Sequence, residues 1–308
     1  MIIHEGLSKF NIPDNPVVTI GTFDGVHLGH RKILQRVCNI TETAKGTSVI
    51  ITFWPHPRLV LYPEETDLKL LNTFQEKAKL LQDFGIDHLI KIPFTESFAR
   101  LTSQEFIIKI LVKAIGTKKL VIGYDHRFGK DREGRFQHLV DNANNYGFEV
   151  EEIPRQEVDN IGISSSKIRK ALFEGEIENA NEFLGRPYNI SGQVVKGDQI
   201  GRNMGFPTAN IQVNDPFKLI PSVGIYAVKV EISGEDFKGM LYIGSRPTLK
   251  RSMQSIEVNI FDFDKNIYNE KINIFFYSQL RKDAKFDNLD QLKVQLEKDK
   301  IAATHVLN

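Results

Sequence analysis

Residues 17–30, VVTIGTFDGVHLGH, combine an apolar strand, a glycine-rich turn and the start of a helix. The apolar, β-branched residues before the turn suit a strand buried in a parallel sheet, and the glycines let the backbone turn sharply and approach a ligand closely. Apolar residues then recur at helical spacing within residues 28–44, so we expect His27 and His30 at the first turn of a helix. Free N–H groups and the helix dipole favour an anion there. The stretch predicts a parallel α/β sheet with a phosphate-binding edge, rather than a helix that merely begins with two surface histidines.

Composition limits the classes of partner. The chain has 308 residues, enough for two hydrophobic cores, and its 41% hydrophobic and 26% charged content is ordinary for a globular protein. A formal net charge of +1 favours small anionic ligands over nucleic acid or a membrane surface. The first residues lack the pattern of a signal peptide, and no apolar run approaches about 18 residues. We therefore expect a cytoplasmic protein that is a monomer or weak homo-oligomer and binds small molecules, with no nucleic-acid or membrane partner.

Strand and helix patterns alternate in the first half of the chain. Strands are predicted at residues 17–21, 48–53, 88–92, 120–123 and 148–153. Helices are predicted between them at residues 33–44, 74–84, 103–115 and 136–146. This βα series predicts a parallel sheet with helices on both faces, in which ligands bind beyond the carboxyl ends of the strands.

The pattern changes near residue 186. Short alternating or apolar runs follow at residues 188–195, 224–232, 237–243, 255–261 and 271–276. They predict a small antiparallel barrel or sandwich. A helix over residues 289–303 is expected to cap it through Leu292, Leu296 and Ile301. We expect one domain over residues 1–185 and another over 186–308, with a helical piece, residues 164–184, between the two cores.

Three further motifs occur in the first half. Residues 53–57, FWPHP, present aromatic and imidazole groups in a loop stiffened by two prolines, and residues 123–129, GYDHRFG, place a carboxylate and a guanidinium beside a bend. Alone, the first motif is equally well a rigid loop with a surface Trp, and the second is better explained as a turn with a local ion pair. In residues 163–169, ISSSKIR, a serine can cap the helix that begins there. Arg169, one turn further, can bind phosphate oxygens in a bidentate manner.

Together, GTFDGVHLGH, FxPHP, GYDHRFG and ISSSKIR resemble the adenylyltransferase half of bacterial bifunctional FAD synthetases, over about residues 15–185. The resemblance implies a Rossmann-like nucleotidyltransferase domain in which the phosphate of FMN attacks the α-phosphate of ATP, giving FAD and pyrophosphate. A phosphate dianion is already a nucleophile, so the protein must mainly align two anions and neutralise charge. The resemblance implies catalytic roles for His27, His30 and Arg169, contacts to ATP phosphates from Gly21, Phe23, Gly29, Ser164 and Ser166, and flavin contacts from Phe53 and Asp125.

Residues 201–210, GRNMGFPTAN, are the most specific string in the second half. Thr208 and Asn210 are two residues apart, so on an extended segment their side chains point the same way. They suit Mg²⁺, which keeps several waters and takes other ligands from phosphates. With the later runs GIY, IGSRPT, IEV and LR, the string resembles the flavokinase module of the same enzymes.

That resemblance implies that Glu257 is the general base that takes the proton from the 5′-hydroxyl of riboflavin as this attacks the γ-phosphate of ATP. It also implies a nucleotide-covering flap of Gly201, Arg202 and Gly205, Mg²⁺ and phosphate contacts from Thr208 and Asn210, and a flavin contact from Arg281.

Some positions depart from the module. Tyr242 stands where an Asn is usual, Leu249 where a Phe is usual, and Asp283 where a Glu is usual. None of these changes removes a proposed metal ligand or base. We therefore expect a bifunctional enzyme that makes FMN from riboflavin and then FAD from FMN, using ATP twice. The alternatives are an adenylyltransferase that acts on another phosphorylated small molecule and a flavin-binding regulator with the same fold and little turnover.

Overall fold

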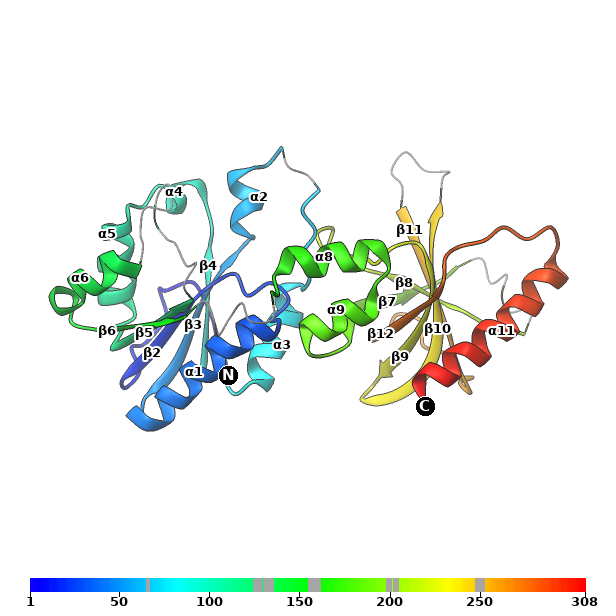
Figure 1. The fold of residues 1–308 in the computed structure, drawn as a ribbon, viewed down its shortest axis with the longest axis horizontal. Coiled ribbons are helices and arrows are strands. Elements are labelled where there is room, and N and C mark those ends of the chain that lie inside the picture. The colour runs from blue at the N-terminus through cyan, green and yellow to red at the C-terminus, as the bar shows by residue number, and fades with distance from the viewer. Residues whose placement is uncertain are drawn as a thin grey trace. The chain divides into compact units, whose positions relative to one another are not determined.

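The computed structural model describes residues 1–64, 67–123, 129, 136–154, 162–197, 201, 205–246 and 253–308. They form two compact units, Met1–Ser164 and Ser165–Asn308 (Figure 1). We expected residues 164–184 between the two cores; Ser164 ends the first unit, and residues 165–184 group with the second. The predicted fold class, a parallel α/β sheet plus a small antiparallel barrel followed by a helix, is confirmed.

The first unit is built on a six-stranded sheet whose neighbouring strands are all parallel. In spatial order the strands are β1 (Ile2–Glu5), β4 (His88–Pro93), β3 (Thr47–Trp54), β2 (Pro16–Ile20), β5 (Lys119–Gly123) and β6 (Glu149–Ile153). From β2 the chain builds the sheet outward on one side and then crosses to the other. The carboxyl end of β2 is therefore the switch point, where ligands of such sheets bind. Strand β1 was not predicted, because four residues carry too short a pattern.

Helices cover both faces of this sheet. They are α1 (Leu28–Ala44), α2 (Pro57–Leu61), α3 (Phe74–Asp83), α4 (Glu96–Ala99), α5 (Ser103–Phe106), the π-helix η1 (Ile107–Ala114) and α6 (Phe136–Tyr146). Helices α1 and α3 share a core with Ile50 and Leu89 of the sheet. Helices α5, η1 and α6 share a core with Val18 and Ile51, whose side chains alternate with the first set. We expected one helix over residues 103–115; the structure divides it into an α-helical turn and a π-helix, two forms that the apolar spacing does not distinguish.

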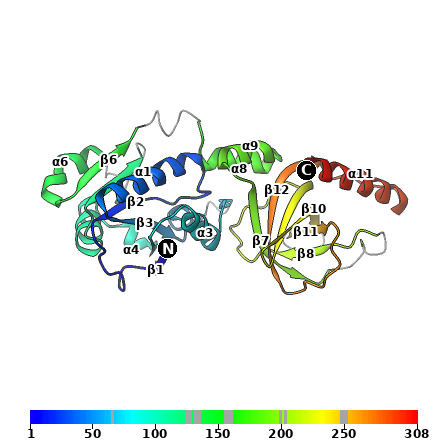
Figure 2. The ribbon, with the colours of Figure 1, turned by 90° about the horizontal axis from the view of Figure 1, so that it is seen from below.

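The second unit contains a closed antiparallel barrel with the strand order β10-β11-β8-β7-β12-β9 (Figure 2). The strands are β7 (Tyr188–Val195), β8 (Ala209–Gln212), β9 (Gly224–Ile232), β10 (Glu235–Arg246), β11 (Met253–Ile260) and β12 (Lys271–Arg281). Strands β7 and β12, the first and last in chain order, pair with each other, with Ile190 opposite Ile274. Side chains alternate between the two faces of the barrel wall: Ile256 and Val258 are buried, whereas Glu257 between them is half-buried.

Three helices accompany the barrel: α8 (Ser165–Glu174), α9 (Ile177–Leu184) and α11 (Leu289–Leu307). On α9, the side-chain amide of Asn181 donates to the carbonyl of Phe276 (2.8 Å) and accepts from the backbone N–H of Tyr188 (2.7 Å). On α11, Leu296, Ala303 and Leu307 pack against the barrel, as shared members of one hydrophobic cluster. The expectation that Ile301 caps the barrel is wrong, since its side chain is 71% exposed and lies on the other side of the helix from Ala303.

Candidate active sites

The turn that follows β2 has an uncommon backbone. Phe23 and Val26 adopt left-handed φ angles of 46° and 41°, which residues with side chains adopt only where the surroundings hold them. Gly21 lies against the ring of Phe23, and a Cβ at that position would lie 3.0 Å from a ring carbon. The backbone N–H of Gly21 donates to the carbonyl of Ile51 on β3 (3.0 Å). The turn is thus fixed against the neighbouring strand β3. The ring of Phe23 leaves little room for a side chain at position 21, which explains why that residue is glycine.

Two buried charged residues, Asp24 within the turn and Lys77 on α3, fix the turn through hydrogen bonds. The carboxylate of Asp24 accepts from the backbone N–H groups of Leu71 (2.9 Å) and Asn72 (3.3 Å), just before α3. The ammonium of Lys77, on α3, donates to the carbonyl of Thr22 (2.6 Å). We predicted neither residue as part of a site. The sequence signal for Lys77 is a lysine within the apolar stripe of a predicted helix.

His27 caps α1, and His30 lies in its first turn. The Nδ1 atom of His27 accepts from the backbone N–H of His30 (3.3 Å), so a neutral His27 ring carries its proton on Nε2. The two rings stack, with centroids 3.7 Å apart and planes inclined by 16°. Phe23 packs edge-on against His30, with ring centroids 5.3 Å apart. The Nδ1 atom of His30 is buried and has no hydrogen-bond partner in the described part of the chain.

This pair is suited to binding an anion. Burial holds the pKa of His30 well below its ordinary value of 6.5, and the charges of His27 and Lys77 lower it further. The His30 ring is therefore neutral at pH 7 in the free protein and has one N–H to donate. The N-terminus of α1, where Gly29 is also buried, adds backbone donors and the positive end of the helix dipole. The structure thus brings His27, His30 and Gly29 together at the switch point.

The aromatic residue predicted to contact flavin lies at the end of the neighbouring strand. Phe53 contacts Phe94 and Phe98, with ring centroids 5.6 Å and 5.7 Å apart. In the same motif, His56 caps α2 by accepting from the backbone N–H of Arg58 (3.2 Å). The FWPHP segment therefore presents an aromatic cluster at the carboxyl edge of the sheet, while its histidine has a local structural role.

The roles of four other predicted residues are not tested by the described part of the chain. Ser164 is the last residue of the first unit, directly before α8. Ser166 is exposed and Arg169 half-buried on α8, which belongs to the second unit. Asp125 lies outside the described residues. Their part in adenylyl transfer stays a prediction.

In the barrel, three side chains form a row across adjacent strands. Asn210 on β8 and Tyr242 on β10 are each the direct cross-strand partner of Glu257 on β11. Directly opposed residues of antiparallel strands have their side chains on one face, so the three side chains are neighbours. Thr208, just before β8, donates from Oγ1 to Oε2 of Glu257 (3.4 Å). The structure thus brings together the candidates for metal ligands and general base. Their hydroxyl, amide and carboxylate groups all offer oxygen, the ligand atom that Mg²⁺ prefers.

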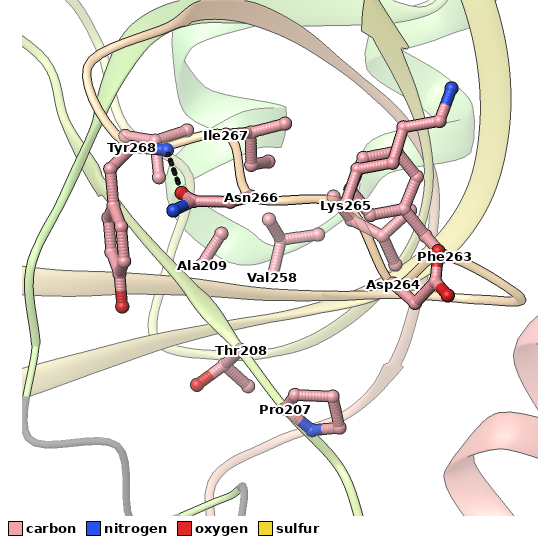
Figure 3. Close-up of a pocket in the computed structure, with 12 residues that line it drawn as sticks. Pro207, Thr208, Ala209, Val258, Phe263, Asp264, Lys265, Asn266, Ile267 and Tyr268 are labelled. Carbon is pink, nitrogen blue, oxygen red and sulfur yellow. Dashed lines mark hydrogen bonds between the residues drawn. The ribbon is translucent and has the colours of Figure 1, made fainter.

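A cavity of about 430 Å³ is lined by residues that are sequence neighbours of this row (Figure 3). Ala209 and Val258 line it, and each is the sequence neighbour of a residue in the row, so the cavity lies on the other face of the same strands. Thr208 also lines it and therefore reaches both the cavity and the carboxylate of the row. Above the apolar floor, the side-chain oxygen of Asn266 accepts from the backbone N–H of Tyr268 (3.1 Å), which shapes the covering loop. An apolar cavity of this size with a few polar groups is typical of a small-molecule site.

The predicted flap is described only in part. A Cβ at Gly201 would lie 2.3 Å from the carbonyl oxygen of Phe206, so only glycine fits that position. Gly205 has a left-handed φ of 83°. Arg202 lies outside the described residues. Close packing at Gly201 and the left-handed φ at Gly205 thus explain why glycine occupies these two positions. The nucleotide contacts of the flap stay predictions.

Two of the departures from the flavokinase pattern contact each other. The hydroxyl of Tyr242 donates to Oδ2 of Asp283 (3.2 Å), although the two residues are far apart in the sequence. The Tyr242 ring lies against Gly244, where a Cβ would be 2.5 Å from the ring and its hydroxyl. Burial, together with the charge of Asp283 and the hydrogen bond to it, raises the pKa of Tyr242 to about 12, so the phenol stays protonated and donates. The changes at these two positions are therefore structurally linked. Leu249 lies outside the described residues.

Tyr242→Phe is expected to lower the free energy of unfolding of the barrel unit by about 1 kcal/mol, because Asp283 loses a donor while the ring remains. Urea unfolding of Tyr242→Phe, Asp283→Ala and the double variant measures the coupling between the two residues. A coupling free energy near zero would contradict the link.

Arg281 has a structural partner that the sequence did not indicate. Its guanidinium donates from Nε to Oδ1 of Asp299 (2.9 Å) and from one Nη to Oδ2 (2.7 Å), across to α11. The side chain of Asp299 is only 4% exposed. Arg281 also lies over the ring of Phe286, 5.7 Å from its centroid. This ion pair joins the end of β12 to α11, and a flavin contact by Arg281 stays a prediction.

Asp299→Ala is expected to destabilise the barrel unit by about 3 kcal/mol, because it leaves a largely buried guanidinium without its carboxylate. Urea unfolding followed by near-ultraviolet circular dichroism measures the loss. The matched control is Glu297→Ala, which removes an exposed carboxylate from the same helix. Equal stability of the two variants would refute the structural role of the ion pair.

Comparisons with known proteins agree with these geometries. The family model described as FAD synthetase matches residues 9–167, and the one described as riboflavin kinase matches residues 184–307. Relatives named bifunctional riboflavin kinase/FMN adenylyltransferase include that of Listeria monocytogenes, 40% identical over 92% of this chain and 90% of the relative. The relative from Bacillus subtilis is 38% identical over 92% and 90% of the two chains, and the relative from Escherichia coli K12 is 36% identical over 93% and 91%.

A solved structure described as a macrolide-efflux protein from Streptococcus pneumoniae is 32% identical to this chain, with a TM-score of 0.89 and coverage of 98% of both chains. In the described part of this chain, no helix combines the length and apolar character that crossing a membrane requires. The two family models and the relatives confirm the prediction drawn from the motifs. This chain belongs to the family of bifunctional riboflavin kinases/FMN adenylyltransferases.

Proposed function

We propose that the barrel unit makes FMN from riboflavin and that the parallel-sheet unit converts FMN to FAD, with one ATP used in each step. The observation that carries this division is the row of Asn210, Glu257 and Tyr242, which Thr208 joins to a cavity large enough for a nucleoside. An adenylyltransferase for another substrate would need no such row. The functional domains proposed are residues 1–185 and 186–308.

In the kinase step, the 5′-hydroxyl of riboflavin attacks the γ-phosphate of ATP. The bond between the γ-phosphorus and the bridging oxygen breaks, and ADP leaves. An alcohol is a poor nucleophile, so its proton passes to the carboxylate of Glu257. The hydroxyl of Thr208, 3.4 Å from Oε2 of Glu257, helps to orient that carboxylate. Thr208 and Asn210 are the residues that would hold Mg²⁺, which would supply charge neutralisation for the ATP phosphates.

The cavity is the proposed place of the ATP nucleoside. Its floor is apolar, and Thr208 both lines it and bonds to Glu257, so Thr208 marks the edge at which the phosphates of a nucleotide bound there would reach the row. Gly201 and Gly205, with Arg202, are proposed to cover those phosphates. Arg281 is proposed to act on the flavin side.

In the adenylyl step, a phosphate oxygen of FMN attacks the α-phosphorus of ATP, and pyrophosphate leaves. No proton has to be removed from this nucleophile. His27 and His30 offer N–H donors at the N-terminus of α1, where charge builds up on the phosphate oxygens. Gly21, Phe23 and Gly29 are proposed to shape this phosphate site. Ser164, Ser166 and Arg169 are proposed as further phosphate ligands, and Phe53 and Asp125 as flavin contacts. We further propose a cytoplasmic location and a monomeric or weakly associated state.

A time course with riboflavin, ATP and Mg²⁺, followed by chromatographic separation of the flavins, tests the function. FMN is expected first and FAD later. Formation of FMN alone would show that the parallel-sheet unit is idle or serves another substrate. If neither product forms with oxidised or reduced flavin, the flavin-binding regulator becomes the better account.

A further inference from the structure

Lys77 is a buried charged residue for which the two proposed reactions provide no role. It lies on α3 and is only 2% exposed. Its neighbours on the helix, Phe74, Ala78 and Leu81, belong to the hydrophobic core under the sheet. Placing an ammonium among them is costly unless its protons find acceptors. A lysine retained in such a position therefore indicates a specific contact.

The contact is made to the phosphate-binding turn. Nζ of Lys77 donates to the carbonyl of Thr22 (2.6 Å) and to Oγ1 of Thr52 on β3 (3.4 Å). Oγ1 of Thr52 in turn donates to the same Thr22 carbonyl (3.4 Å). The ammonium also lies over the ring of Trp54, 5.4 Å from its centroid. One side chain thus joins the loop after β2 to the end of β3.

The hydrogen bond from Lys77 to the Thr22 carbonyl matters because of where Thr22 lies in the turn. Thr22 lies between Gly21, which is bonded to β3, and Phe23, whose φ is 46°. The ring of Phe23 packs against His30. A shift of the Thr22 carbonyl would rotate the peptide that enters Phe23 and would move the ring against which His30 rests.

We propose that Lys77 is a positioning residue for adenylyl transfer, whose ammonium fixes the Thr22 carbonyl and thereby the turn that presents Phe23, His27 and His30. The inference rests on the proposed function of the histidine pair. Lys77 does not contact substrate in this account and acts through the backbone of the turn.

The protonation of Lys77 gives the proposal a distinctive test. Burial lowers the pKa of its ammonium from 10.5 to about 8, and the charge of Asp24 in the turn opposes that shift. His30 on α1 faces it as the second titratable group, while β3 contributes the uncharged Thr52 and Trp54. On α3 itself, Glu76 accepts from the backbone N–H of Thr73. Above about pH 8 Lys77 becomes a neutral amine, and its bond to Thr22 loses the assistance of charge.

The experiment uses the full chain and supplies FMN and ATP directly. Lys77→Met is expected to lower kcat for FAD synthesis about 100-fold, with much smaller changes in KM for FMN and ATP, since misplaced groups mainly affect the transition state. The fluorescence of Trp54, the single tryptophan of the chain, reports that the parallel-sheet unit is folded, and FMN formation from riboflavin on the same sample reports that the barrel unit is intact. Lys79→Met is the matched control, because it removes an exposed lysine from the same helix. Its FAD synthesis is expected to equal that of the wild type.

Lys77→Arg supplies a readout that a merely structural lysine would not give. Wild-type kcat for FAD synthesis is expected to fall several-fold between pH 7 and pH 9.5, relative to the kinase rate, whereas Lys77→Arg stays charged and keeps its rate over that range. This variant also carries the test if Lys77→Met does not fold.

The outcomes separate the inference from the proposed function. If the wild type makes no FAD from supplied FMN, the proposed function of the histidine pair is wrong. If the wild type makes FAD, then unchanged kcat in Lys77→Met refutes the positioning role. Identical pH profiles for wild type and Lys77→Arg refute it as well.

Discussion

Glu257→Gln is expected to abolish FMN formation while FAD synthesis from supplied FMN continues at the wild-type rate. The amide keeps the size of the carboxylate and still offers an oxygen to the hydroxyl of Thr208, so the barrel is expected to fold normally. It cannot take a proton from the riboflavin hydroxyl. General-base catalysis contributes up to about 10⁴-fold, so we expect kcat for FMN formation to fall about 10³-fold with little change in KM for ATP. Initial rates with riboflavin, and separately with FMN, measure both activities.

The control for this variant is Glu297→Gln, which alters an exposed carboxylate of the same unit. Its FMN formation is expected to match the wild type. FMN formation by Glu257→Gln at more than about a tenth of the wild-type rate would remove Glu257 from the role of general base. Loss of both activities in a folded Glu257→Gln protein would show that the two reactions do not use separate sites.

His30→Ala is expected to stop the pathway at FMN. The change removes one donor at the N-terminus of α1 and the ring that stacks on His27 at 3.7 Å. Loss of a donor that stabilises developing negative charge costs about 10²–10³-fold in kcat, and the lost stacking partner lets His27 reorient. Chromatography of the flavins is expected to show FMN accumulating at the wild-type rate with FAD nearly absent.

Two further variants make this result interpretable. His138→Ala removes an exposed histidine of the same unit and is expected to make FAD normally. His30→Gln retains an N–H donor, so it is expected to recover part of the FAD synthesis that His30→Ala loses. Wild-type FAD synthesis by His30→Ala would refute the role of the histidine pair.

Local patterns were sufficient to predict most of the fold. Period-two alternation and apolar runs predicted strands such as β7 and β9, because one or both faces of each are buried. The same patterns predicted α1 and placed His27 and His30 at its start, because the turn, the cap and the first helical turn are contiguous in sequence. The π-helix η1 was not predicted, since its apolar spacing is also that of an α-helix.

Contacts between distant segments could not be predicted in this way. Lys77 bonds to Thr22, and Arg281 pairs with Asp299, only because packing brings separate elements together. Lys77, Arg281 and Asp299 are charged and would ordinarily be assigned to a solvated surface. The side of α11 that meets the barrel was also misjudged at Ile301, because a helix with apolar residues on several sides does not indicate which side is buried.

The pairing of β7 with β12 has a consequence for synthesis of the chain. The parallel sheet has all its strands once β6 has been made, ending at Ile153, so it can assemble while the rest of the chain is still on the ribosome. The barrel cannot close until β12 has emerged, because β12 pairs with both β7 and β9. Until then these two strands present open edges that invite pairing with other nascent chains. An mRNA truncated before the codons for β12 would therefore yield an aggregation-prone polypeptide, in which the parallel sheet is complete but the barrel has unpaired strand edges. Loss of the 3′ end of the transcript is thus expected to increase aggregation.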